Sequence, residues 1–163
     1  MFNRTHGVEI VKRRTVVALM LVLAACKSAG GSGASAGSVG AAGPRQAASQ
    51  FLESIKSEDV QATSIIWGSE KGPARELISN RGDLEKRILI MQCNLNHDSV
   101  RIVSDLPGEG SQRNLKVELR RGQLTAQTTM TVVQGPNQRW FVKNTDLAPM
   151  RGFCSSQPQE QKR

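Results

Sequence analysis

The stretch LKVELRRGQLTAQTTMTVV, residues 115–133, decides the fold. Its first half alternates apolar and polar residues from Leu115 to Leu119, and the alternation resumes after a turn at Gly122. A period of two gives a strand one apolar face and one wet face. Two such strands joined by a short turn form an antiparallel hairpin. The stretch therefore predicts the centre of an antiparallel sheet that buries one face.

Two further strands flank this hairpin. Upstream, Val100 and Ile102 alternate with polar residues. Downstream, Gly135-Pro136-Asn137 is a typical turn, and residues 139–145 (RWFVKNT) follow it as an apolar segment. Consecutive strands joined by turns predict a four-stranded antiparallel meander.

Before the strands, the apolar residues recur at helical spacing. The first stripe consists of Ala48, Phe51, Leu52 and Ile55. Spacings of three and four residues place its members on one side of a helix. Ser57-Glu58-Asp59 is a typical capped start for a second helix, residues 60–67. Residues 68–73 (GSEKGP) are expected to form a plain loop.

A third helix is predicted from Leu84 to Leu95, with Asp83 as its cap. Apolar residues occupy both of its sides, with Leu89, Ile90 and Cys93 opposite the main stripe. A helix that is apolar nearly all round is buried on two sides, so we expect this one to be central. A strand over residues 88–91 is the alternative, because periodicity cannot separate the two over so short a run.

The first 25 residues have the pattern of an export signal. Basic residues from Arg4 to Arg14 precede an apolar run, Thr15–Ala25. As a helix this run would rise only about 16 Å, whereas a membrane span needs roughly 20 residues. A cleavable signal is therefore favoured over a spanning anchor.

Residues 27–46 are almost entirely Gly, Ser and Ala, which predicts a flexible tether with an r.m.s. reach of about 25 Å. The predicted organisation is a signal peptide at 1–25, a modified cysteine and tether at 26–46, one domain at 47–155 and a polar disordered tail at 156–163.

Leu23-Ala24-Ala25-Cys26 resembles the lipobox of bacterial lipoproteins. The resemblance implies that the Cys26 thiol receives diacylglycerol, that the chain is cut before it, and that its new amine is acylated, for example with palmitate. Several acyl chains give a firm anchor, because each buried methylene contributes about 0.8 kcal/mol. The domain is then expected to face the periplasm in the cell envelope. Lys27, where an Asp resembles an inner-membrane retention signal, favours the outer membrane.

Two alternatives for the N-terminus remain open. One is an ordinary secretory signal that happens to end in a cysteine. The other is a twin-arginine signal at Arg13-Arg14.

The scarcity of aromatic residues argues against a nucleic-acid partner. Without residues 1–25 the chain has 18 Lys and Arg against 13 Asp and Glu, a net charge of +5. Binding of single strands needs aromatic faces between basic residues, whereas the few aromatics here lie in apolar patterns. The small excess of positive charge is compatible with a protein that lies close to anionic lipid head groups. The alternative is an ordinary solvated surface with no partner.

Two cysteines, Cys93 and Cys154, remain once Cys26 is lipidated. An even pair in an oxidising compartment predicts a disulfide, which the chain-entropy model values at about 4 kcal/mol, and two buried free thiols are the alternative. One histidine and two distant cysteines do not suffice for a zinc site, so no metal is expected. No nucleotide fingerprint or nucleophile elbow is present, and no cofactor is expected.

The order of elements from Arg45 to about Cys154 resembles the nuclear transport factor-like (SnoaL-like, cystatin-like) α+β domains. The resemblance implies about three N-terminal helices packed on a curved, cone-like sheet, an apolar pocket, and pairing through the sheets into a homodimer. The candidate residues for lining the pocket are Trp67, Met91, Met130 and Trp140.

The leading hypothesis is a non-catalytic envelope lipoprotein that binds a small apolar ligand or a partner protein. A SnoaL-like enzyme that uses His97 and an acid, such as Asp98, is one alternative, since histidine is the usual general base. The other is a scaffold for envelope assembly. Fold alone does not choose among them.

Overall fold

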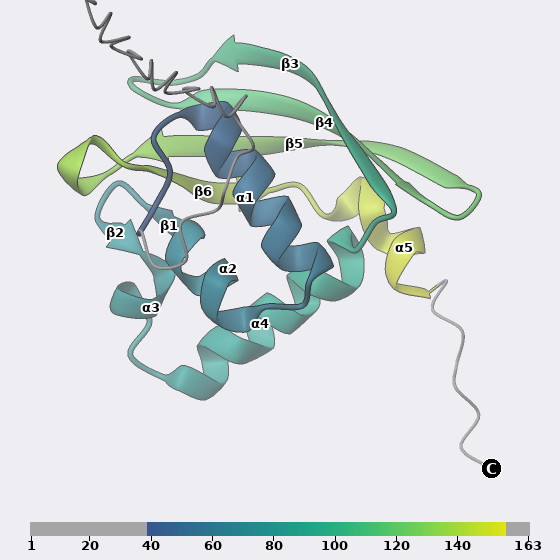
Figure 1. Cartoon of the computed structure of the whole chain (residues 1–163), viewed down its shortest axis with the longest axis horizontal. Helices are drawn as coiled ribbons and strands as arrows, with labels where there is room; N and C mark the ends of the chain where they lie inside the picture. Colours follow the sequence, from purple (N-terminus) through teal and green to yellow (C-terminus); the bar gives the residue numbers. More distant parts are fainter. Residues whose placement is uncertain (1–38, 156–163) are drawn as a thin grey trace, which may run out of the picture. The chain divides into compact units, whose positions relative to one another are not determined.

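The computed structural model describes residues 39–155. They form an α+β domain with a four-stranded antiparallel sheet and several helices, which confirms the predicted fold class at this level. Figure 1 shows the helices gathered on one side of the sheet. The predicted signal peptide, the lipobox with Cys26, the first part of the tether and the tail at 156–163 lie outside the described residues.

The four-stranded sheet is a meander in the order β3-β4-β5-β6. Its strands are β3 (Ser99–Pro107), β4 (Arg113–Arg121), β5 (Leu124–Gln134) and β6 (Trp140–Thr145). In the predicted hairpin, Leu115 lies opposite Met130 and Leu119 lies opposite Ala126. Directly opposed residues share a face of the sheet, so this register collects the apolar positions on one side. A single turn of 3-10 helix, η1 (Pro136–Gln138), joins β5 to β6.

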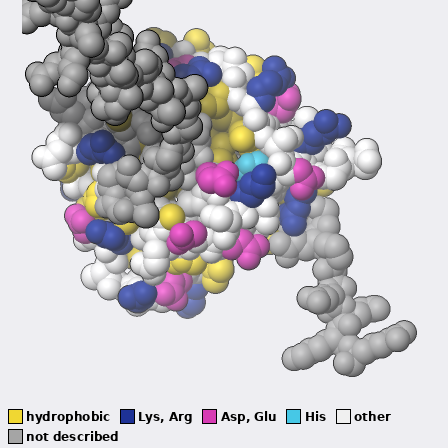
Figure 2. Space-filling view, viewed as in Figure 1, with side chains coloured by type: hydrophobic (Ala, Val, Ile, Leu, Met, Phe, Trp, Pro, Cys, Tyr) yellow, Lys and Arg dark blue, Asp and Glu magenta, His cyan; other side chains and the backbone are white. Residues whose placement is uncertain are grey.

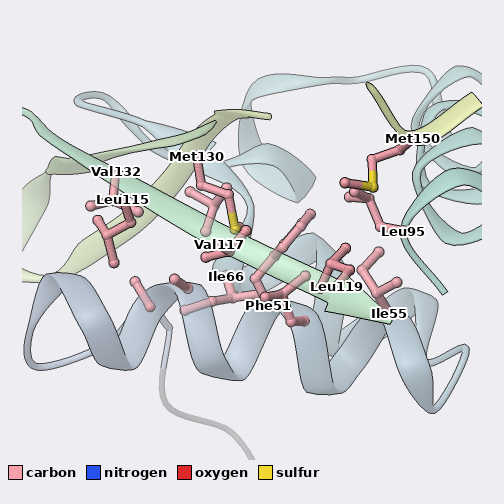
Figure 3. Packing of buried hydrophobic residues seen from close by; sticks show 14 of the residues in the cluster. Phe51, Ile55, Ile66, Leu95, Leu115, Val117, Leu119, Met130, Val132 and Met150 are labelled. Carbon is pink, nitrogen blue, oxygen red and sulfur yellow. The ribbon is translucent and has the colours of Figure 1, made fainter. Parts of the chain in front are cut away.

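Helix α1 (Pro44–Lys56) covers the apolar face of the sheet. Proline suits its first position, where a backbone N–H would lack a helical partner anyway. The predicted stripe of Ala48, Phe51, Leu52 and Ile55 is buried, at 1% exposure or less. Figure 3 shows Phe51 and Ile55 directed at side chains of the sheet, among them Val117 and Leu119. This contact is the main hydrophobic core.

Three short elements follow α1 in the chain: a helix, a two-stranded ribbon and a further short helix. Helix α2 (Val60–Ile66) begins where predicted, and the Asp59 carboxylate accepts a hydrogen bond from the Ala62 N–H at 2.9 Å. The loop at 68–73 contains a small ribbon, β1 (Gly68–Ser69) paired with β2 (Gly72–Pro73), and is followed by α3 (Ala74–Leu77). Gly68 is needed there, because a Cβ would clash with the Gly72 carbonyl oxygen.

Helix α4 (Arg81–Leu95) differs from the prediction in two ways. Its cap is Asn80, whose side chain accepts from the Asp83 N–H at 3.1 Å, so the expectation that Asp83 caps the helix is wrong. Only one side is buried: Leu89 and Ile90 are each 56% exposed. Helix α4 packs against α1, α2, α3 and α5, and no element among the described residues covers its outer side. The alternative of a strand over residues 88–91 is also wrong.

The chain closes the end of the core with η2 (Ala148–Met150) and α5 (Arg151–Ser155). Met150 and Phe153 from this segment belong to the main core. Not every helix therefore precedes the sheet.

The fold begins earlier in the chain than predicted. Ala41 is fully buried and pairs with Trp140 through two backbone hydrogen bonds of 2.9 Å. The Arg139 guanidinium donates to the Val39 carbonyl at 3.1 Å. Residues 39–46 thus belong to the domain rather than to the tether, because small residues fit closely against the β6 edge. Ala34–Arg163 is one compact unit with its own core, and we expect it to fold by itself.

Candidate functional site

The four residues predicted to line a pocket lie in and around the core. Met130 is fully buried, and Trp67, Met91 and Trp140 are half-buried and pack against the core residues. None of the four lines either of the two hollows described below. Their side chains fill the space between the helices and the sheet.

The larger hollow is a cleft of about 430 Å³ between α2, α3 and the start of α4. Helix α2 contributes Val60, Gln61 and Ser64, while Ile78 and Ser79 come from the loop after α3. Leu84 of α4 forms part of the apolar floor with Val60 and Ile78, which pack together in a satellite of the core. The cleft has the size of a small-molecule site.

Charged side chains surround this apolar floor. Arg75 and Glu76 come from α3, and Arg81 and Glu85 come from α4. The Arg81 Nε lies 3.2 Å from a Glu85 oxygen, but both side chains are well exposed, so this pair contributes little to stability. Arg75 has neither an ion pair nor a side-chain hydrogen bond to any residue in the described range. Glu76 likewise has no ion pair or side-chain hydrogen bond to a described residue, so Arg75 is the unpaired cation and Glu76 the unpaired anion at the cleft.

The cleft has no signature in the amino-acid sequence. Its walls come from two helices, a four-residue helix and a loop, so no periodic pattern marks them. The only local signal is the Asn80 cap, which places Ser79 and Arg81 at the start of α4. Nothing in the order of residues indicates that α2 lies opposite this entrance.

A smaller hollow of about 220 Å³ lies beside the β5–β6 turn. Arg139 and Phe141 line it together with Val39 at the start of the described chain. Asn137 and Gln138 in this turn have positive φ values of 55° and 57°, which side chains other than glycine adopt at some cost. The hollow lies where Val39, at the start of the described chain, meets the β5–β6 turn.

His97 lies apart from the cleft, between α4 and β3. It is 4% exposed, and its Nδ1 lies 2.9 Å from the Leu95 carbonyl oxygen. Because a carbonyl only accepts, Nδ1 donates the proton in this bond. The Asp98 carboxylate accepts instead from the Gly122 N–H at 2.7 Å. These contacts connect the helix to the sheet, and no side-chain bond joins His97 to Asp98 in the described structure.

Burial lowers the pKa of His97, and the nearby Lys56 acts in the same direction. The bond to Leu95 and the charges of Glu53 and Asp98 raise that pKa, but they do not outweigh burial. Folded His97 is therefore neutral at pH 7.

This pKa shift predicts that the domain loses stability as the pH falls. The unfolded chain takes up a proton near pH 6.5, whereas the folded chain resists it, so the stabilisation present above pH 6.5 is lost below it. From pH 7.5 to 5.5 the free energy of unfolding should fall by no more than about 1.4 kcal/mol. Urea unfolding of Ala34–Arg163, whose only histidine is His97, measures this. His97→Gln should flatten the dependence, and an unchanged slope in that variant would refute this cause.

Cys93 of α4 and Cys154 of α5 meet at disulfide distance, with their Cα atoms 4.8 Å apart. This separation lies within the range that a disulfide requires. The bond ties the last helix to the side of α4, as the sequence predicts for this pair.

Other site types are not found in the described range. No three His, Cys, Asp or Glu side chains of residues 39–155 are grouped so as to hold a metal ion. Among the described helices, none is both long and apolar enough to span a membrane. No model of a known protein family matches the chain. No curated protein matches it either.

Proposed function

We propose that this protein is a lipoprotein of the bacterial cell envelope, anchored through Cys26 and facing the periplasm. The support is the order of a basic segment, a short apolar run and Leu23-Ala24-Ala25-Cys26. The Cys93–Cys154 pair accords with an oxidising compartment. The curved, cone-like form of the nuclear transport factor-like domains belongs to this proposal, and the meander with helices on one face accords with it.

The proposed role of the domain is to bind a small amphipathic anion in the cleft between α2, α3 and α4. One observation carries this role: the cleft of about 430 Å³ has an apolar floor and a guanidinium, that of Arg75, without an internal partner among the described residues. An apolar group of the ligand would lie on Val60, Ile78 and Leu84. Its carboxylate, sulfonate or phosphate would meet Arg75, whose planar fork suits such groups. His97 is not among the residues that line the cleft.

The anchor predicts the covalent state of the natural protein. Intact mass of the membrane-extracted protein should correspond to a chain that begins at Cys26 and carries two or three acyl groups. Cys26→Ser should leave the protein without acyl groups and release it from the membrane fraction, because the thioether needs the thiol. A chain that still begins at Met1, or that carries no acyl group, would contradict the anchor.

The cleft predicts binding of an anionic apolar probe. Anilinonaphthalene sulfonate should bind to Ala34–Arg163 with enhanced fluorescence, and Arg75→Ala should weaken it about tenfold, since a hydrogen bond to a charged group contributes about 1.5 kcal/mol. Ser79→Trp should abolish binding by filling the cleft from an exposed position.

Lys71→Ala provides the matched control, because Lys71 is an exposed cation outside the cleft. All variants should unfold at the same urea concentration, which separates loss of binding from loss of the fold. Equal affinity in the wild type, Arg75→Ala and Ser79→Trp would place the probe elsewhere and remove the proposed role.

A further inference from the structure

The outer side of α4 presents two adjacent aliphatic side chains to solvent. Leu89 and Ile90 are each 56% exposed, and they are more exposed than every other large apolar residue in the described range except Leu106. Single exposed apolar side chains are common on soluble proteins. Leu89 and Ile90 are consecutive in the helix and each is more than half exposed, so they are not scattered single residues.

Two cations flank this aliphatic pair. Lys86 precedes Leu89 by three residues and Ile90 by four, so its side chain lies beside both on the helix surface. Arg87 precedes Ile90 by three residues. Lys86 and Arg87 are both exposed, and neither has an ion pair with a residue of the described structure. These four residues, Lys86, Arg87, Leu89 and Ile90, are called the α4 patch.

The acidic residues near the patch do not cancel its charge. Glu85 pairs with Arg81 on the side of α4 that faces the cleft. Asp83 precedes Lys86 by three residues and Arg87 by four, but it forms no ion pair with either of them in the described structure. Figure 2 shows charges of both signs interspersed on the face that it draws.

We propose that the α4 patch docks the domain onto an anionic lipid surface. Aliphatic side chains beside lysine and arginine are the composition of helices that lie in the membrane interface. Leu89 and Ile90 would enter the head-group region, while Lys86 and Arg87 would meet lipid phosphates. A second copy of the same patch would bring four unpaired cations together, which disfavours self-association through it.

The length of chain outside the described structure permits this contact. Residues 27–38 separate the proposed lipid anchor at Cys26 from Val39, and twelve residues reach at most about 43 Å. A domain of this size has a radius of gyration of about 13 Å, so that length can pass along one side of it. The inference takes its motive from the proposed anchor, but it is tested without the anchor.

The test uses the unit Ala34–Arg163, which lacks Cys26 and therefore cannot be acylated. It should co-sediment with vesicles of phosphatidylglycerol and phosphatidylethanolamine and bind much less to phosphatidylcholine alone. Lys86→Glu with Arg87→Glu should lower the vesicle partition at least tenfold, since each cation contributes about fivefold. Leu89→Ser with Ile90→Ser should lower it by a similar factor. The matched control is Arg45→Glu with Lys71→Glu, which reverses two exposed cations outside the patch and should have a smaller effect.

Equal partition of the wild type and both patch variants would overturn the proposal, as would equal binding to anionic and neutral vesicles. A dimer that dissociates in Leu89→Ser with Ile90→Ser, without vesicle binding, would assign the patch to a second copy and also overturn it. Unchanged urea midpoints verify that all variants fold. Arg75→Ala should not alter vesicle partition, so failure of the cleft and failure of the patch can be told apart.

Discussion

Replacing Phe51 with alanine is expected to lower the free energy of unfolding of the domain by about 4 kcal/mol, within the range for buried aromatic residues. Phe51 is fully buried in the middle of α1, where it faces the apolar side of the sheet (Figure 3). The residue contributes apolar surface, and its removal leaves a cavity that the sheet and helix cannot close without moving. Urea unfolding of Ala34–Arg163 at pH 7.5 measures the change.

Glu53→Ala is the control for this variant, because Glu53 lies on the exposed side of the same helix. Its effect should stay within about 0.5 kcal/mol. A loss below about 1 kcal/mol for Phe51→Ala would mean that the contact between α1 and the sheet is not the main core.

Removal of the Cys93–Cys154 bond is expected to have the second large effect. The bond joins residues that are 61 positions apart, and the chain-entropy model gives about 4 kcal/mol for a loop of that length. Cys93→Ala with Cys154→Ala should therefore lower the free energy of unfolding by about 3 to 4 kcal/mol relative to the oxidised wild type.

Reduction of the wild type provides the internal comparison. Reductant should move its urea midpoint towards that of the double variant, and it should leave the midpoint of the double variant unchanged. Intact mass with and without reductant reports whether the bond is present. An oxidised wild type no more stable than the double variant would show that the bond adds no stability.

The centre of this fold could be predicted from short-range patterns. The hairpin from Leu115 to Val133 and the stripe on α1 appear in the structure on the faces expected for them. The spacing of apolar residues is a local property of the chain, and it determines which side of each element is apolar.

The surroundings of α4 could not be predicted in the same way. Its sequence shows that apolar side chains lie on both sides of the helix. It does not show whether another element covers each side. The structure buries Leu84 and Ile88 and leaves Leu89 and Ile90 in solvent. The predicted pocket residues show the same limit, since Met130 is apolar whether it faces a cavity or fills one.

The sequence by itself determined the class of the domain, the strand order, the face of α1 that is buried and the identity of the two cysteines that can pair. These features follow from periodicity, turn residues and counting, which depend on neighbours in the chain. Only the tertiary structure decided that α2, α3 and α4 enclose a cleft with Arg75 at its rim, and that one side of α4 stays exposed. The physical reason is that clefts and exposed faces depend on how elements distant in the sequence pack together. A local pattern of residues does not specify that packing.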